Sequence, residues 1–478
     1  MGNEIIGREN EIIILEKLLV SKKPELLAIY GRRRIGKTYL IKTYYKESLS
    51  FSCSGQHNGK TQEQLINFTE ELNTYFPEKK KMLAARTWQE AFQFLKECVN
   101  SIDHRRKKVI FFDELPWLDS HKSRFLSSFS YFWNSYASEK KDLLVIICGS
   151  AASWIIEKIV NSKGGLHNRI TQKIRLLPFS LLETEQYLKK RNINIERYQL
   201  LQLYMVMGGV PAYLDAIERS KSAGQNIENI CFLKDGLLVN EFDNLYAALF
   251  HNPEKHIQVI RALAKKNKGI TRSEILNTTK LLTGGGITTV LNELTESGFI
   301  ERLFLFGDKQ KDNVYRLTDE FSLFYFKFME HQRRQENGQW LLKQTTASYI
   351  SWCGYAFENI CLKHIAQIKR ALQVGAVQST ESAWSHQGTK EKYGGQIDLL
   401  IDRADQTITI CEIKFSTRPF VINKKYATEL RRKMDVFRQH TNTRKTILMV
   451  FITTYGLTRN DYAEELSDDE ITMNGLFI

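Results

Sequence analysis

The stretch that decides the predicted fold reads Gly31-Arg32-Arg33-Arg34-Ile35-Gly36-Lys37-Thr38. An apolar run, Leu26 to Tyr30, precedes it and predicts a buried strand, and the residues after it can continue as a helix. Glycines at both ends allow a tight turn in which backbone N–H groups point into one concavity that accepts phosphates. The segment Gly31 to Tyr39 is therefore predicted to be a phosphate-binding loop (P-loop) for ATP. Lys37 would reach the β- and γ-phosphates, and the Thr38 hydroxyl would ligate Mg²⁺.

An acidic pair follows about 75 residues later. The four apolar residues Val109 to Phe112 lead directly into Asp113 and Glu114. A continuous apolar run that ends in charge is typical of a central strand in a parallel sheet, and ligands bind at the carboxyl ends of such strands. We therefore expect Asp113 to hold Mg²⁺, directly or through water, and Glu114 to polarise the attacking water.

Two more polar residues are candidates for contact with the nucleotide. Ser150 follows the apolar run Leu143 to Cys148, where its hydroxyl could sense the γ-phosphate or could cap a helix. Arg169 could act as an arginine finger in a neighbouring subunit, could contact the nucleotide of its own chain, or could be an ordinary surface residue.

The 478 residues include 68 Lys and Arg against 54 Asp and Glu, a net charge of +14. This balance permits binding to nucleic acid or another anionic surface without identifying either, and the basic runs 105–108 and 431–433 are more often solvated faces. The seven cysteines show no zinc-ligand spacing. No apolar run reaches the ~20 residues that span a bilayer, so we expect a cytoplasmic protein without membrane contact.

The first half of the chain resembles the prokaryotic P-loop ATPase family related to AAA+ and STAND proteins. The matching marks lie in the family's order over about residues 1–250: Gly7-Arg8-Glu9, Gly31 to Thr38, Phe112-Asp113-Glu114, Gly149-Ser150, Arg169, Pro178-Phe179-Ser180 and Gly208-Gly209-Val210-Pro211. The last of these cannot lie inside a helix and predicts a junction within a helical lid. Related members often continue into a winged helix and a domain that resembles restriction-endonuclease folds.

The middle of the chain carries the pattern of a winged helix. Three helical segments precede two alternating strands around Gly307-Asp308-Lys309; the segments are 254–266, 270–276, 287–297, 299–304 and 313–317. The third helix carries little positive charge, whereas a helix that reads DNA usually exposes Arg, Lys, Asn or Gln. A DNA-binding role and a purely structural role therefore stay equally open.

The C-terminal third contains two predicted strands, 395–401 and 407–415. Alternation puts Glu412 and Lys414 on one face of the second strand, where an unpaired buried charge is costly. With Asp398, these residues resemble the motif of the PD-(D/E)xK nuclease superfamily.

That resemblance implies that Asp398 and Glu412 bind Mg²⁺ and that Lys414 orients or activates the hydrolytic water. Glu358 would support the metal from a preceding helix. Superfamily members often carry an acid where this chain has Gln396. A nuclease-like fold that only binds nucleic acid and a fortuitous surface ion pair are the alternatives.

We therefore predict an α/β protein with a P-loop NTPase parallel sheet and a helical lid, then a winged helix, then an α/β restriction-endonuclease-like domain. The predicted segments are 1–180, 181–250, 251–320 and 321–478. Nucleotide state would control a Mg²⁺-dependent nuclease-like domain that acts on nucleic acid, with DNA favoured. The alternatives are a STAND-like switch with a non-catalytic C-terminal domain and a homo-oligomeric remodeller in which Arg169 acts in trans.

Overall fold

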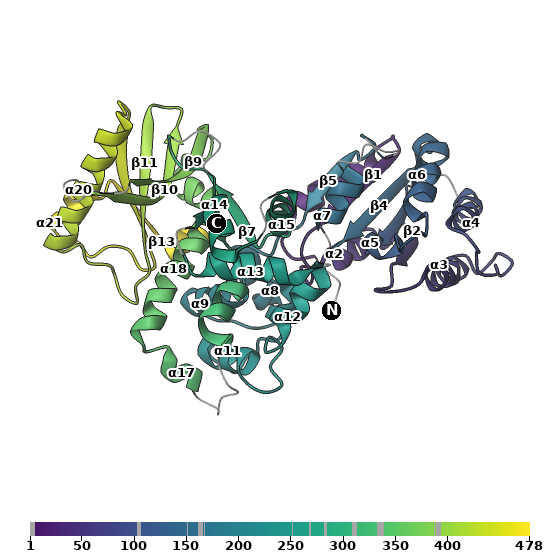
Figure 1. Cartoon of the computed structure of the whole chain (residues 1–478), viewed down its shortest axis with the longest axis horizontal. Helices are drawn as coiled ribbons and strands as arrows, with labels where there is room; N and C mark the ends of the chain where they lie inside the picture. The colour runs from purple at the N-terminus through teal and green to yellow at the C-terminus, as the bar shows by residue number, and fades with distance from the viewer. Residues whose placement is uncertain are drawn as a thin grey trace. The chain divides into compact units, whose positions relative to one another are not determined.

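The structure is a computed structural model that divides into two compact units, Met1–Pro178 and Phe179–Ile478 (Figure 1). The described residues are 5–102, 107–150, 152–160, 166, 168–250, 252–266, 269–281, 284–307, 313–331, 339–386, 388 and 393–478. Four residues of the predicted basic run and wing turn lie outside them: Arg105, Arg106, Asp308 and Lys309. The predicted lid, winged helix and C-terminal domain all belong to the second unit.

A five-stranded parallel sheet forms the centre of the first unit, with strand order β2-β3-β4-β1-β5. Its strands are β1 (Glu25–Tyr30), β2 (Leu49–Ser54), β3 (Lys108–Asp113), β4 (Leu143–Gly149) and β5 (Gln172–Arg175). Strands β3 and β4 are buried along their whole length. Burial on both faces explains why their sequences are continuous apolar runs rather than alternating ones.

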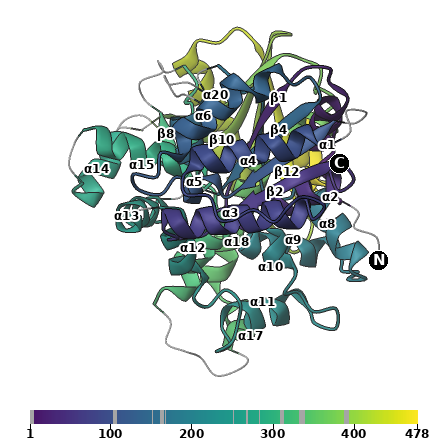
Figure 2. The same ribbon diagram turned by 90° about the vertical axis from the view of Figure 1, so that its right-hand side faces the viewer.

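Helices cover both faces of this sheet (Figure 2). An aromatic-rich core joins one face to α3 (Thr61–Tyr75), α4 (Trp88–Asn100) and α6 (Phe125–Ser135), and a smaller core joins the other face to α1 (Glu9–Val20) and α2 (Lys37–Tyr44). The remaining short elements are α5 (Leu115–Leu118), η1 (Ala137–Glu139), α7 (Ala152–Ile155) and the π-helical η2 (Ile156–Val160). This layering confirms the predicted α/β class and parallel sheet.

The second unit begins with helices α8 (Leu181–Lys190), α9 (Arg197–Met207), α10 (Pro211–Leu214), α11 (Ala223–Cys231) and α12 (Glu241–Leu249). The predicted junction is confirmed, because α9 ends at Met207 and α10 begins at Pro211. A Cβ atom at Gly209 would lie 1.8 Å from the carbonyl oxygen of Phe179. Only glycine permits this backbone approach.

A three-stranded antiparallel sheet of order β6-β8-β7 follows, with three helices. These elements are α13 (Pro253–Ala264), β6 (Ile270–Thr271), α14 (Arg272–Thr279), α15 (Gly285–Glu296), β7 (Ile300–Leu303) and β8 (Val314–Leu317). The capping box of Thr271 and Glu274 starts α14. The helices and the β7–β8 pair lie where the sequence pattern predicts them.

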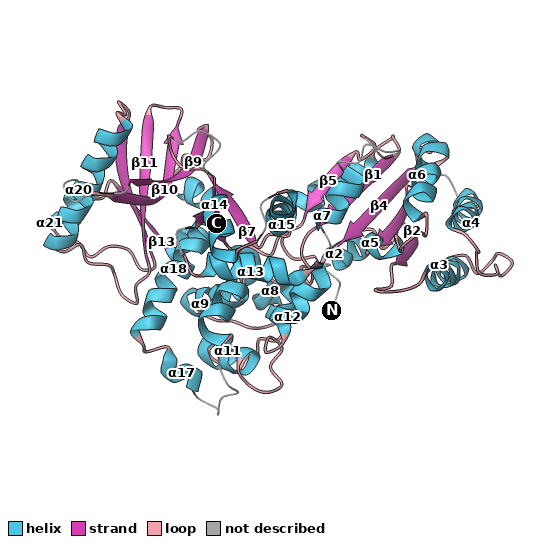
Figure 3. Ribbon diagram, in the orientation of Figure 1, coloured by secondary structure: helices cyan, strands magenta, loops and turns pink. Residues whose placement is uncertain are grey.

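A second five-stranded sheet, of order β13-β12-β11-β10-β9, lies near the end of the chain (Figure 3). Strands β9 (Ser379–His386), β10 (Gly395–Arg403) and β11 (Thr407–Lys414) are antiparallel, and β11, β12 (Thr446–Thr453) and β13 (Asp469–Thr472) are parallel. Helix α18 (Ala347–Lys363) packs on one face, and α20 (Lys424–Thr441) with α21 (Asp461–Leu466) on the other. The other elements are α16 (Glu320–Phe324), the π-helical η3 (Tyr325–Met329), α17 (Gln339–Lys343), α19 (Ile365–Ala371) and η4 (Met473–Leu476).

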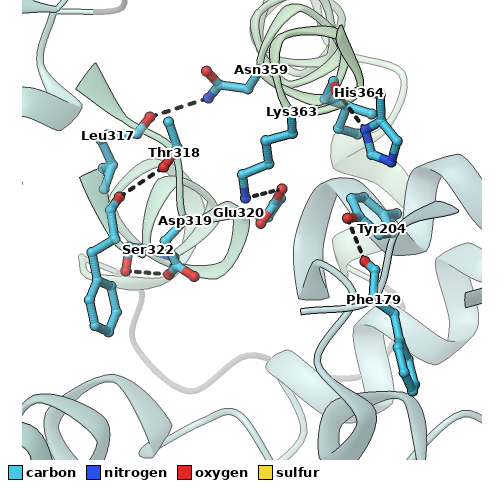
Figure 4. A network of polar contacts seen from close by, with 12 residues as sticks. Phe179, Tyr204, Leu317, Thr318, Asp319, Glu320, Ser322, Asn359, Lys363 and His364 are labelled. Atoms are coloured by element: carbon cyan, nitrogen blue, oxygen red, sulfur yellow. Dashed lines mark hydrogen bonds and ion pairs between the residues drawn. The ribbon is translucent and has the colours of Figure 1, made fainter. Parts of the chain in front are cut away.

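The C-terminal end of α18 is held by a polar network with residues from distant parts of the second unit (Figure 4). Lys363 Nζ donates to Glu320 Oε1 at 2.6 Å, and Asn359 Nδ2 donates to the carbonyl oxygen of Leu317 at 3.4 Å. His364 Nε2 accepts from the backbone N–H of Leu181 at 3.1 Å. Its Nδ1 lies 2.7 Å from the carbonyl oxygen of Ile360, so the neutral ring carries its proton on Nδ1.

This geometry predicts a pH dependence of stability. Burial of the ring lowers the pKa of His364 from 6.5 to about 4. The unfolded state therefore binds the proton more tightly, and the stability of the second unit should fall as pH falls from 6.5 to 4. The loss should approach about 3 kcal/mol, at about 1.4 kcal/mol per pKa unit.

Urea unfolding of the His364→Gln variant across this pH range tests the prediction. The variant should lose markedly less stability on acidification than the wild type. The exposed His121 serves as the control, since His121→Gln should leave the wild-type pH dependence unchanged. An equal pH dependence in wild type and His364→Gln would contradict the assignment.

Candidate nucleotide site and C-terminal cleft

The predicted P-loop connects β1 to α2 at the carboxyl edge of the first sheet. Gly31 has φ +149°, and a Cβ atom there would lie 2.3 Å from the carbonyl oxygen of Leu176. Gly36 has φ +88°, and a Cβ atom there would meet nothing within 4 Å. Glycine is thus required at Gly31 by packing and at Gly36 by backbone conformation, and the space beside Gly36 fits a phosphate group.

Arg8 supports the loop. This buried residue precedes α1, and its guanidinium donates to the carbonyl oxygens of Leu177, at 2.7 Å, and of Ile35, at 3.2 Å. Through Arg8, the Gly7-Arg8-Glu9 segment therefore connects the P-loop with the residues that follow β5. The sequence marked this segment as a family motif, but only the fold identifies its contacts.

Lys37 begins α2 and is buried. Its ammonium donates to the carbonyl oxygens of Gly31 and Arg32, at 2.9 and 2.8 Å, and to Ser150 Oγ at 3.1 Å. These three contacts hold the charge inside the loop, beside the turn at Gly36. A cation at this place suits the phosphates of a nucleotide.

Thr38 and Asp113 lie together, as their predicted shared role requires. Thr38 Oγ1 donates to Asp113 Oδ2 at 2.7 Å, although the residues are 75 positions apart. Asp113 ends β3, which places its carboxylate at the sheet edge occupied by the P-loop. A hydroxyl and a carboxylate are hard oxygen ligands, so this pair fits Mg²⁺.

Glu114 adopts the left-handed conformation, with φ 42° and ψ 46°. This region is unfavourable for a residue other than glycine, and surrounding contacts must hold it. Ser150 does so twice, because its Oγ donates to Glu114 Oε1 at 2.6 Å and its backbone N–H donates to Oε2 at 3.1 Å. Ser150 therefore orients Glu114 and contacts Lys37, which the sequence did not indicate.

Of the other predicted nucleotide residues, Arg33 and Tyr39 belong to the P-loop segment, whereas Arg169 precedes β5, whose Gln172 pairs with Leu27 near the amino end of β1, and so lies at the opposite edge of the sheet. Arg169 lies in an exposed turn whose backbone N–H donates to the carbonyl oxygen of Leu166. Arg33 lies over the ring of Trp117, 5.9 Å from its centre, and Tyr39 is 51% exposed. The roles of Arg169 and of these loop side chains toward nucleotide stay predictions.

In the second unit, the predicted C-terminal residues line one cleft of about 570 Å³. Glu358 comes from α18, Asp398 from β10, and Glu412 and Lys414 from β11. The cleft also contains Arg432 and Lys433 from α20, which the sequence analysis considered only as part of a basic run. The fold thus brings together residues spread over about 75 positions.

Glu412 is the most strongly held carboxylate of this cleft. It is buried and accepts from Tyr426 Oη at 2.5 Å and from Lys433 Nζ at 2.6 Å, and it pairs with Lys414 Nζ at 2.9 Å. Burial alone would raise the pKa of Glu412, but Lys433 and Lys414 outweigh it and lower the pKa to about 2. Glu412 is therefore ionised at neutral pH.

The other two carboxylates have different surroundings. Burial raises the pKa of Glu358 to about 7, although Arg316 of β8 lies 2.8 Å away and opposes the shift. Asp398 Oδ1 accepts a hydrogen bond from Gln396 Nε2 at 2.6 Å. Gln396 stands where superfamily members often carry an acid, and in this chain it binds Asp398 instead.

Among the described residues, no three His, Cys, Asp or Glu side chains come close enough together to hold a metal ion. Glu412 is bound by Lys433, Lys414 and Tyr426 rather than turned toward Asp398 and Glu358. The donor types fit Mg²⁺, but a metal would have to compete with these cations. The ligand roles of the three carboxylates therefore remain predictions.

In the nucleotide site, the residues expected to bind ATP are different from the residue expected to activate the attacking water. Glu114→Gln should retain ATP binding, because Lys37 and Thr38 are unchanged, and should lower the ATP hydrolysis rate at least about 100-fold by removing the candidate base. Release of inorganic phosphate and binding of a fluorescent ATP analogue measure the two effects. Glu70→Gln, an exposed residue of the same unit, is the control. Unchanged hydrolysis in Glu114→Gln would exclude a role for Glu114 in the chemistry.

The chain is similar to known proteins over its N-terminal part and, in one case, over most of its length. Residues 5–217 match the model of an ATPase domain found predominantly in Archaea. An uncharacterized protein of Methanocaldococcus jannaschii is 25% identical over 90% of this chain and 91% of its own length. An uncharacterized ATP-binding protein of the same organism is 26% identical over 54% of this chain and 82% of its own length.

Among solved structures, the Walker-type ATPase of Pyrococcus abyssi matches 68% of this chain and 96% of its own, with a TM-score of 0.49 and 18% identity. Within the described part of the chain, no helix has the length and apolar character to cross a bilayer.

The matching family model agrees with the P-loop geometry around Lys37, Thr38 and Asp113. Residues 5–217 therefore contain an ATPase domain of the P-loop class.

Proposed function

We propose that this protein binds and hydrolyses ATP and that its nucleotide state controls a nuclease-like C-terminal domain that acts on nucleic acid. One observation carries the proposal for the first unit. The ammonium of Lys37, the Thr38–Asp113 pair and the Glu114 carboxylate lie at one sheet edge. Ser150 joins Lys37 to Glu114, and the Glu114 N–H donates to Asp113 Oδ1 at 3.0 Å.

In the proposed reaction, the P-loop N–H groups and Lys37 bind the phosphates. Thr38 and Asp113 would hold Mg²⁺, and the ion would supply charge neutralisation at the phosphate oxygens. Glu114 accepts a proton from the attacking water, and the two hydrogen bonds from Ser150 fix the direction of its carboxylate. Ser150 is thus a positioning residue for Glu114.

The cleft between α18, β10 and β11 supports the nuclease-like part of the proposal. Glu358, Asp398 and Glu412 supply carboxylates, and Lys414 is placed on the same strand as Glu412 to orient a water. The three helices and the β6-β8-β7 sheet before it suit a winged helix. Nucleic acid, with DNA favoured, is the proposed partner because the chain is basic and the cleft contains Arg432 and Lys433.

A short covalent segment supports control by nucleotide. Leu176 contacts Gly31 of the P-loop, and Arg8 binds Leu177, within the first unit. Immediately afterwards, within the second unit, Tyr204 Oη donates to the carbonyl oxygen of Phe179 at 2.8 Å (Figure 4). The Leu181 N–H donates to His364 Nε2 at 3.1 Å.

His364 directly follows α18, the helix that carries Glu358. The six residues 176–181 are therefore anchored at one end to the phosphate loop and at the other to the helix of the cleft. A segment this short has little slack, so a displacement at Leu176 would act on α18. This is the physical link that we propose for control.

The alternative function is an ATP-driven switch whose nuclease-like domain binds a partner without cleaving it. The observation in its favour is the bonding of Glu412 to Lys433, Lys414 and Tyr426, which leaves the carboxylate engaged. The ammonium groups of Lys433 and Lys414 also supply positive charge to the cleft. Such cations can bind phosphate groups without a metal ion.

Cleavage assays with Mg²⁺ on plasmid, linear and single-stranded DNA and on RNA, with and without ATP, distinguish the two functions. Wild type should cleave at least one substrate, and Asp398→Asn and Lys414→Ala should lower the rate at least about 100-fold. The exposed Glu464→Gln is the matched control. Lys37→Ala, which removes the P-loop ammonium, should abolish any ATP dependence.

Two results would change the conclusion. No cleavage of any substrate, with ATP hydrolysis intact, would establish the switch instead. Cleavage that is lost in Lys414→Ala but is indifferent to ATP and to Lys37→Ala would retain the nuclease and overturn its control by nucleotide.

A further inference from the structure

A second cavity, of about 340 Å³, adjoins the cleft within the second unit. It is lined by residues of α13, α16, η3 and α18, elements that precede the C-terminal sheet. Ser351 and Tyr355 line both this cavity and the cleft. The two hollows are therefore neighbouring parts of one surface path, which we call the α18 path.

One face of α18 forms the floor of the α18 path. Ser351, Tyr355 and Glu358 stand at i, i+4 and i+7, so they share a helix face. At a rise of 1.5 Å per residue, the floor extends for about 10 Å between Ser351 and Glu358.

Cations stand at both ends of the α18 path. Arg261, Lys265 and Lys327 line the second cavity, and Lys414, Arg432 and Lys433 line the cleft. Glu330 pairs with Arg261 at 2.5 Å, while Lys265 and Lys327 are exposed. The cleft also contains four carboxylates, and Lys414 and Lys433 pair with one of them, Glu412. The exposed cations of the α18 path are therefore Lys265 and Lys327 at one end and Arg432 at the other, and cations at both ends suit a chain of phosphates.

Aromatic side chains accompany these cations. The partly exposed Phe326 lines the second cavity, where the guanidinium of Arg261 lies 5.5 Å from its ring centre. Tyr393 is 67% exposed, and the guanidinium of Arg432 lies 4.4 Å from its ring centre. Cations that follow a backbone, together with accessible aromatic rings on which bases stack, are the combination used for single strands. A duplex hides its base faces and gains nothing from such rings.

We infer that the α18 path binds single-stranded nucleic acid and guides it from the cavity beside α13 and η3 into the C-terminal cleft. Lys265 and Lys327 contact phosphates at the entrance, and Arg432 does so at the cleft. This inference rests on the proposed function only for what happens to the strand in the cleft, because binding is measured without cleavage.

Fluorescence anisotropy with a labelled oligothymidine of about 30 nucleotides, longer than the roughly 16 nucleotides of the largest comparable sites, tests the inference. Titrations in EDTA at several salt concentrations give both affinity and its salt dependence. Lys265→Ala with Lys327→Ala should weaken binding about tenfold. It should also reduce the slope of log affinity against log salt by about 1.4, since each phosphate contact on a single strand contributes about 0.7.

Lys234→Ala with Lys255→Ala is the matched control. Both lysines are exposed residues of the second unit outside the two cavities, and the charge change is the same. This control should retain the affinity and slope of the wild type. Thermal unfolding of both double variants verifies that they are folded.

The outcomes separate this inference from the proposed function. Wild-type binding that is unaffected by the Lys265/Lys327 double variant, or equally weakened in the control, would overturn the α18 path while leaving the nuclease-like function intact. Equal affinity for a duplex of the same length would overturn the assignment to single strands. Absence of any binding would overturn both this inference and the nucleic-acid part of the proposed function, with the ATPase domain unaffected.

Discussion

The nucleotide site depends on the parallel alignment of β1, β4 and β3. Ladder hydrogen bonds pair Tyr30 with Gly149 and Phe112 with Ile147, so the three strands end at nearly the same level. Gly31 and Ser150 directly follow β1 and β4, and Asp113 is the last residue of β3, so the three residues meet at one edge. A shift of one residue in either pairing would separate the Ser150 hydroxyl from Glu114 and Lys37.

Buried charge is tolerated in both units only where oppositely charged or hydrogen-bonding groups surround it. Lys37 is enclosed by two carbonyl oxygens and a hydroxyl, and Glu412 by two ammonium groups and a phenol. Such groups are costly to bury alone, and removing one partner leaves the other unsatisfied. Their placement at clefts rather than in the apolar cores agrees with a role in binding or chemistry.

The segment between the two units is bonded through its backbone on both of its sides. Arg8 and Gly31 hold it beside the phosphate loop, and Tyr204 and His364 hold it beside α18. Each of these contacts reaches the backbone of the segment, so they also satisfy its N–H and carbonyl groups. The same helix then forms the floor that joins the two cavities of the second unit.

The sequence by itself determined the features that depend on local order along the chain. Periodicity and turn chemistry predict these features: the P-loop glycines, the apolar strands that lead into Asp113 and Ser150, the helix junction at Gly208 to Pro211, and the β10–β11 pair. The division of the second unit and the roles of Arg169, Glu358 and Asp398 remained predictions. Only the tertiary structure decided which distant groups meet: Ser150 with Glu114, Lys433 and Tyr426 with Glu412, Arg316 with Glu358, and Leu181 with His364. These pairs lie on different strands and helices, and their contact depends on strand order and helix packing, which no local pattern specifies.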